Sequence, residues 1–339
     1  MGSRVMSRAW LIEQLAALAP RDAASAQATR ERVNDILRPT GALARLDEIA
    51  IWIASWQHSA QPSVSQPVGL IFAANHGVAA AGVSNYPVEV TAAMVAAFEA
   101  HSSTVTAFAE IAGATVSVVD VGVAEPSNDF RTMRAVDAER VDRVIEQARR
   151  AVDALDTDLL VIGEMGIGNT TAAAAVAHAL YGGQVHEWVG RGTGVDDAGL
   201  ARKQQAVARG VARMERDAPD ASGIDVVAEV GGLELVAMAA AIVAARQRSL
   251  PVLLDGYVVS AAAAALLDHD RDALAHCRAG HRSAEPGHRR LLALMGLEPL
   301  LDLDLRLGEA SGAMAAVPLV RMACAGVTRV PTFTEWFSR

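Results

Sequence analysis

The sequence has little cysteine, few aromatic residues and no cluster of basic residues. Among its 339 residues are two cysteines, Cys277 and Cys324, too few for a disulfide framework or a cysteine-based zinc motif. This usage is typical of a reducing compartment, so we expect a cytoplasmic protein. The formal net charge of -9 argues against nucleic acid as a partner. A bound phosphate must therefore be held by local donors rather than by a general positive field.

The sequence also lacks a long apolar segment. Residues 1–10 carry Arg4 and Arg8 but no apolar core of signal-peptide length. Residues 236–245 are apolar, yet they are too short to cross a bilayer, and Glu234 and Arg246 bracket them. Hydrophobic residues make up 52% of the chain, which is enough for a sizeable core. We therefore expect a soluble protein with no membrane partner.

A glycine-rich stretch stands out at residues 163–171, which read Gly-Glu-Met-Gly-Ile-Gly-Asn-Thr-Thr. The apolar residues 159–162 before it predict a buried strand, and the alanine-rich residues 172–180 after it predict a helix. Glycines let the backbone approach a ligand closely, and the N–H groups at a helix N-terminus attract anions. The spacing alone fits both a phosphate site and a plain turn between strand and helix.

Strands and helices are expected to alternate along most of the chain. Strands are predicted at residues 68–74, 115–121, 159–162, 251–254 and 274–278. Helices are predicted within 8–54, with a break at 39–41, and at 89–109, 138–155, 172–180, 200–217, 233–246, 257–267, 286–295 and 313–325, with a loop at 303–312. This order predicts an α/β fold: a mainly parallel, doubly wound (Rossmann-like) sheet with helices on both faces.

The polar, glycine-rich segments all follow predicted strands. They are residues 75–77, 163–171, 255–256 and 280–287. In parallel sheets, ligands bind at the carboxyl ends of the strands. This clustering favours the phosphate-site interpretation of the glycine-rich stretch.

Metal and serine-hydrolase chemistry have little support. His76, His281 and His288 show neither HExxH nor paired-cysteine spacing, so we expect hydrogen-bonding histidines, no metal and no cofactor. Ser84 lies in no GxSxG elbow. Glu309 lies between glycines ahead of a predicted helix. A carboxylate there suits a general base, and it equally suits a group that only stabilises the helix N-terminus.

Several motifs together resemble those of the nicotinate-nucleotide:dimethylbenzimidazole phosphoribosyltransferases. Residues 163–171 look like the signature loop of that family. Further matches follow in family order, at residues 39–43, 74–78, 229–232, 253–256, 281–287 and 306–309. Several long motifs in one order are far more specific than a single glycine loop.

The resemblance implies a reaction of cobalamin assembly, in which nicotinate mononucleotide transfers its phosphoribosyl group to 5,6-dimethylbenzimidazole. It implies that Glu309 is the general base, that Glu164 stabilises positive charge at the anomeric carbon and that Lys203 pairs with phosphate or carboxylate. It further implies that the substrates are bound by Gly166, Gly168, Asn169, Thr170 and Thr171 at the phosphate, by Ser84, Tyr86 and Val88 beside the benzimidazole, and by His76, Asp255, Ser283 and Gly308.

The resemblance also implies a homodimer and a small helical domain built from both chain ends. Residues 1–60 would contribute to that small domain, and residues 61–325 would form the large catalytic domain. The last helices of the large domain are candidates for the small domain as well, and residues 326–339 would be a C-terminal tail. Three positions depart from the family: Asn75 replaces Asp, Ala310 replaces Gly, and Val88 stands where several members have Gln. Two alternatives stay open, a non-catalytic nucleotide-binding homologue and a ribosyl transferase or nucleosidase with another acceptor.

Overall fold

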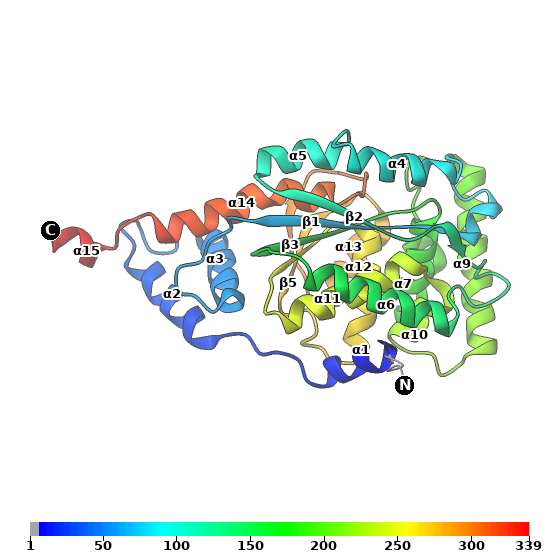
Figure 1. The fold of residues 1–339 in the computed structure, drawn as a ribbon, viewed down its shortest axis with the longest axis horizontal. Helices are drawn as coiled ribbons and strands as arrows, with labels where there is room; N and C mark the ends of the chain where they lie inside the picture. The colour runs from blue at the N-terminus through cyan, green and yellow to red at the C-terminus, as the bar shows by residue number, and fades with distance from the viewer. Residues whose placement is uncertain (1–6, 339) are drawn as a thin grey trace.

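The computed structural model describes residues 7–338 (Figure 1). At its centre is a six-stranded sheet in the order β2-β1-β3-β4-β5-β6. The strands are β1 (Pro67–His76), β2 (Thr115–Ser127), β3 (Leu159–Met165), β4 (Val252–Leu254), β5 (Cys277–Arg282) and β6 (Pro299–Asp302). All neighbouring strands are parallel, which confirms the predicted fold class. The chain moves from β1 to β2 on one side and then to β3 on the other, so the topological switch point lies between β1 and β3.

Helices cover both faces of the sheet (Figure 1). One face carries α1 (Ser7–Ala16), α6 (Ala138–Asp153), α7 (Asn169–Tyr181), α11 (Leu233–Gln247) and α12 (Tyr257–Ala264). The other carries α3 (Ala44–Gln57), α4 (Glu89–Glu99), α5 (Thr104–Ala112) and α14 (Ser311–Thr328). Side chains alternate along a strand, so Leu70 and Phe72 join the first cluster while Ile71 joins the second.

Further elements complete the described part of the chain. They are η1 (Gly77–Ala81), α2 (Ala23–Asp35), α8 (Val185–Trp188), α9 (Asp197–Asp217), α10 (Ile224–Val230), η2 (Ala265–Asp268), α13 (Pro286–Met295) and α15 (Phe333–Phe337). Among the described residues, α14 is the one helix long and apolar enough to cross a membrane, but 56% of that window is buried inside the protein. The core helix of a globular domain meets the same test.

The structure differs from the predicted elements in several places. The helix expected at 89–109 is two helices, because Ser103 begins α5 with a capping box that includes Thr106. The strand expected at 274–278 lies at β5, three residues later. Strand β6, within a segment left unassigned, was missed because its four residues carry too short a pattern to show a period.

Segments from near both ends of the chain pack against each other. Helices α2 and α3 pack against each other and against α14, and the C-terminal α15 lies beyond the end of α14 (Figure 1). Arg32 of α2 donates to the carbonyls of Val327 and Val330 and pairs with Glu335, so residues expected to form a tail are tied to the N-terminal helices. Helix α1 packs instead on α6 and α11, unlike α2 and α3. The division into two domains stays a prediction.

Candidate active site

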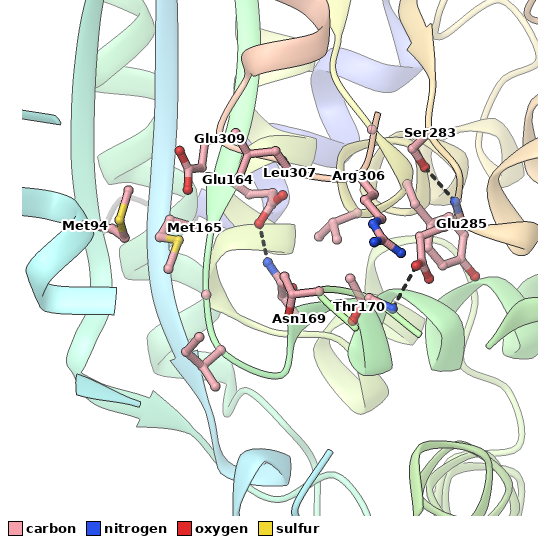
Figure 2. A pocket seen from close by; sticks show the side chains of 18 of the residues that line it. Met94, Glu164, Met165, Asn169, Thr170, Ser283, Glu285, Arg306, Leu307 and Glu309 are labelled. Atoms are coloured by element: carbon pink, nitrogen blue, oxygen red, sulfur yellow. Dashed lines mark hydrogen bonds between the residues drawn. The ribbon is translucent and has the colours of Figure 1, made fainter. Parts of the chain in front are cut away.

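A cavity of about 350 Å³ opens at the carboxyl ends of the strands. Its walls come from the end of β3, the glycine-rich loop that follows, the end of β5 and the loop before α14 (Figure 2). The segments that supply them are 164–170, 281–285 and 306–309. The structure thus brings three of the sequence motifs together around one space.

The two ends of the cavity differ in chemistry. Met94 and Met165 lie at one end with Glu309, so this end is largely apolar, and Tyr86 and Val90 also line the cavity. Thr170, Ser283, Glu285 and Arg306 lie at the other end, with Glu164 and Asn169 in between (Figure 2). A flat apolar ring fits the first end, and a polar or anionic group fits the second.

Glu309 is held by an unusual turn of the backbone. Gly308, Glu309 and Ala310 all have positive φ, at 83°, 61° and 63°. Left-handed conformations of non-glycine residues cost energy and gather at functional sites. The turn lies directly on β3: the Glu309 N–H donates to the carbonyl of Glu164 at 3.2 Å. A Cβ on Gly163 would lie 2.3 Å from the Ala310 nitrogen, so only glycine fits there.

The carboxyl groups of Glu164 and Glu309, which both line the cavity, have raised pKa values. Burial, with the nearby charge of Asp255, raises the pKa of Glu309 to about 7. Burial raises the pKa of Glu164 well above its usual range, and the charges of Asp255, Glu234 and Glu309 add to this. The Asn169 side chain donates to Glu164 and opposes that rise. Burial thus disfavours the ionised form of both groups, and Glu309, with a pKa of about 7, is partly ionised at neutral pH and able to accept a proton.

The glycine-rich loop ends at the N-terminus of α7, where Gly168 adopts φ 98° as the N-cap. Beside it, the buried Lys203 donates from Nζ to Thr170 Oγ1 at 3.0 Å. Burial lowers the pKa of Lys203, and the carboxylate of Glu285 opposes that change. A hollow of about 50 Å³ adjoins the cavity here, lined by Ser84, residues 166–170 and Lys203. A helix N-terminus with an ammonium and a hydroxyl suits an anion.

Thr170 and Thr171 are not equivalent. Thr170 lines both the cavity and the hollow, and it contacts Lys203. Thr171 is fully buried, lines neither space, and its Oγ1 has no hydrogen-bond partner within residues 7–338. Of the two hydroxyls predicted at the phosphate, the structure brings only that of Thr170 to the cavity surface.

His76 and Asp255 lie behind the cavity wall rather than in it. His76 Nε2 is 2.5 Å from Glu234 Oε1, and both side chains are fully buried beneath the glycine-rich loop. Asp255 is fully buried, accepts the Ala313 N–H at 2.8 Å and lies 3.5 Å from His281 Nε2. Both positions support the loops that form the site.

The loop after β1 contributes unevenly. Tyr86 lines the cavity, and the Ser84 hydroxyl accepts the Tyr86 N–H while facing the small hollow. Val88 is 38% exposed and is not among the residues lining either space. Its carbonyl accepts a hydrogen bond from Asn75, whose amide also donates to the carbonyl of Val123. A carboxylate at position 75 could not make these two bonds, so Asn75 fits its surroundings here.

Sequence reasoning missed several cavity residues. Glu285, Arg306 and His281 stood inside the quoted motifs, but no signal showed that their side chains face the cavity. Met94 carried no signal at all, because a methionine on an apolar helix is typical of ordinary core. Within residues 7–338, no group of three or more His, Cys, Asp or Glu side chains is arranged to hold a metal. The roles assigned to individual residues stay predictions.

Comparison with known proteins agrees over most of the chain. A family model described as "Phosphoribosyltransferase" matches residues 18–336. The chain is 47% identical over 315 residues to a protein of Ruegeria pomeroyi, covering 93% of this chain and 92% of that one. It is 48% identical over 320 residues to a protein of a Jannaschia species, covering 94% of each. Both relatives are named nicotinate-nucleotide–dimethylbenzimidazole phosphoribosyltransferase.

Solved structures give the same picture. The crystal structure of CobT from Thermus thermophilus matches with a TM-score of 0.87 at 40% identity, covering 92% of this chain and 98% of that one. A second structure from the same organism, titled as the phosphoribosyltransferase, matches with a TM-score of 0.86 at 38% identity, covering 94% of this chain and 99% of that one.

Proposed function

Because this chain belongs to the nicotinate-nucleotide–dimethylbenzimidazole phosphoribosyltransferase family, we propose that its cavity binds nicotinate mononucleotide at the Thr170 end and a benzimidazole at the Met94 end. The enzyme transfers the phosphoribosyl group to 5,6-dimethylbenzimidazole, and α-ribazole 5′-phosphate and nicotinate are formed. The product is the nucleotide of the lower ligand of cobalamin.

One base is sufficient for this reaction. The bond between the anomeric carbon and the pyridinium nitrogen breaks, and its electron pair stays with nicotinate. The ring of the departing nicotinate is then neutral, so no general acid is needed. One acceptor nitrogen forms the new bond from the opposite face, which inverts the β-riboside to an α-riboside. The other acceptor nitrogen then loses its proton to a base. Glu309, at the apolar end of the cavity, is that base.

The observation that carries the proposal is the position and acidity of Glu309. Its carboxyl group lies beside the methionine wall where a flat aromatic acceptor fits. Because burial and Asp255 raise its pKa to about 7, it binds a proton more strongly than an ordinary carboxylate yet is partly ionised at neutral pH. A base with a pKa near the working pH is the most effective one.

Glu164 and Lys203 act on the donor. Burial raises the pKa of Glu164, whereas a cationic pyridinium beside it favours the ionised carboxylate, because an opposite charge nearby lowers a carboxyl pKa. The carboxylate then stabilises positive charge at the anomeric carbon. Lys203, Thr170 and the N–H groups at the start of α7 hold the 5′-phosphate.

We further propose a cytoplasmic homodimer. The free, buried Cys277 and Cys324 are compatible with a reducing compartment. Exposed apolar side chains of Phe108 and Ile111 on α5 and Met322 on α14 lie on two helices that pack together. Ile111 is 84% exposed, which is costly for a side chain of its size unless a partner covers it.

Incubation with nicotinate mononucleotide and dimethylbenzimidazole, with products identified by mass, tests the function. We expect α-ribazole phosphate and nicotinate. Glu309→Gln should retain donor binding and lose about 10²–10⁴ in kcat. Glu298→Gln, on the exposed surface, is the control and should keep the wild-type kcat. The wild-type kcat should fall as pH decreases below about 7, because Glu309 is then protonated. Donor binding without any product would favour a non-catalytic homologue, and ribose phosphate as the sole product would favour a nucleosidase.

A further inference from the structure

Arg306 brings a positive charge to the main cavity that nothing in the protein neutralises. Among the described residues that line this cavity, it is the one arginine or lysine. It lies in the loop between β6 and α14, and Figure 2 shows its guanidinium pointing into the cavity at the polar end. Within residues 7–338, the guanidinium makes no hydrogen bond and no ion pair.

A free guanidinium in a cavity limits what the cavity binds. The group is always charged, and its N–H donors form a planar fork that matches a carboxylate or a phosphate. The other arginine near the site is already engaged: Arg191, beside the small hollow, pairs with Asp197 and donates to the carbonyl of Val195 at 2.9 Å. Arg306 therefore has its donors available for an anionic group of the ligand.

The proposed donor offers two anionic groups, and the geometry separates them. Its phosphate is assigned to the hollow at the start of α7, which Lys203 and Thr170 line and Arg306 does not. Its other anion is the carboxylate of nicotinate. Because the acceptor attacks from the face opposite the leaving group, nicotinate lies on the side of the ribose away from the Met94 end. Arg306 lies on that side (Figure 2).

We propose that Arg306 binds the nicotinate carboxylate and so selects nicotinate mononucleotide over nicotinamide mononucleotide. This rests on the phosphoribosyl transfer proposed above. A hydrogen bond between two charged groups is stronger than one between neutral groups, and a carboxylate accepts both N–H groups of the fork. The neutral amide of nicotinamide has one oxygen and an NH₂ group that cannot accept, so it loses the charge and the second bond.

The test compares three donors: nicotinate mononucleotide, nicotinamide mononucleotide, which lacks the carboxylate, and nicotinate riboside, which lacks the phosphate. For each, kcat/KM and the calorimetric Kd are measured with the wild type and with Arg306→Gln. The preference for nicotinate over nicotinamide mononucleotide should fall by about tenfold or more in the variant. The preference for the nucleotide over the riboside should stay the same. Arg150→Gln, an exposed arginine on α6, should leave both preferences unchanged.

Other roles of Arg306 predict other results. If the variant loses the preference for the phosphate instead, Arg306 binds the phosphate and the proposal is overturned. It is equally overturned if all three donors weaken by the same factor, since Arg306 then only supports the turn that carries Glu309. If Arg306→Gln does not fold, Arg306→Lys keeps the charge and removes the fork, and an unchanged preference for nicotinate contradicts bidentate binding. If the wild type converts no donor, the proposed function fails, and the Kd values alone decide the role of Arg306.

Discussion

At the scale of single residues, one carboxyl group links stability to pH. The pKa of Glu309 is raised to about 7 in the folded protein, against about 4.3 in an unfolded chain. The folded state therefore binds the proton more tightly, and the stabilisation this gives at low pH is lost as pH rises through about 7. Above that pH, the folded protein carries the cost of a buried carboxylate.

Glu309→Gln should therefore stabilise the protein at pH 8, by on the order of 1–3 kcal/mol. The advantage should shrink toward pH 5, where the wild-type carboxyl group is neutral in the folded state. Denaturant unfolding at both pH values measures this, with Glu298→Gln as the surface control. An advantage that is equal at both pH values would show that Glu309 titrates normally.

The two neighbouring threonines offer a second residue-scale prediction. Thr170→Val removes a hydroxyl that lines the cavity and accepts from Lys203, so nicotinate mononucleotide should bind about tenfold or more weakly. Thr171→Val replaces a buried hydroxyl that has no partner within residues 7–338, so donor affinity should change little and stability should not fall. Calorimetric titration of both variants compares them directly. Equal losses would show that the hydroxyls act together.

At the scale of elements, strand β3 and the turn before α14 form one unit. Gly163 lets residues 308–310 lie directly on the strand, and Glu164 is both the next residue of β3 and the backbone partner of Glu309. Glu309, the proposed base, and Glu164, proposed to stabilise charge on the donor, are thus positioned by a contact between segments far apart in the chain.

Gly163→Ala should break that unit. The added Cβ would lie 2.5 Å from the Ala310 Cβ, and overpacking of this kind costs about 1–3 kcal/mol. The turn must move, so kcat should fall with the stability. Gly326→Ala in α14 is the control: its nearest neighbour would be 3.7 Å away, and alanine favours a helix by up to about 1 kcal/mol. Gly163→Ala with normal activity would mean that the turn tolerates displacement.

At the scale of the whole molecule, the exposed apolar side chains on α5 and α14 predict how copies associate. Ile111→Glu places a charge at the centre of the proposed interface and should shift the dimer toward monomer by about tenfold or more in Kd, since burying an unpaired carboxylate is costly. Leu294→Glu changes a half-exposed leucine on α13 and should leave association unchanged. Sedimentation equilibrium measures both. A wild type that is monomeric at micromolar concentration would contradict the dimer.

The sequence alone determined the fold class and the family. Alternating apolar periods specify strands and helices locally, and motifs such as residues 163–171 and 306–309 are contiguous, so both can be read without knowing what packs against them. The errors fell on short elements: β6 carries four residues, and the Ser103 cap that divides α4 from α5 is only a few residues long.

Only the tertiary structure decided which side chains meet in the site. It separated Thr170 from Thr171 and Tyr86 from Val88, and it added Met94 to the cavity wall. Within a motif, spacing fixes the order of residues, but the direction of each side chain depends on the distant segment that packs against it. The acidity of Glu309 has the same origin, because burial and the charge of Asp255 exist only once the chain has brought its separate segments together.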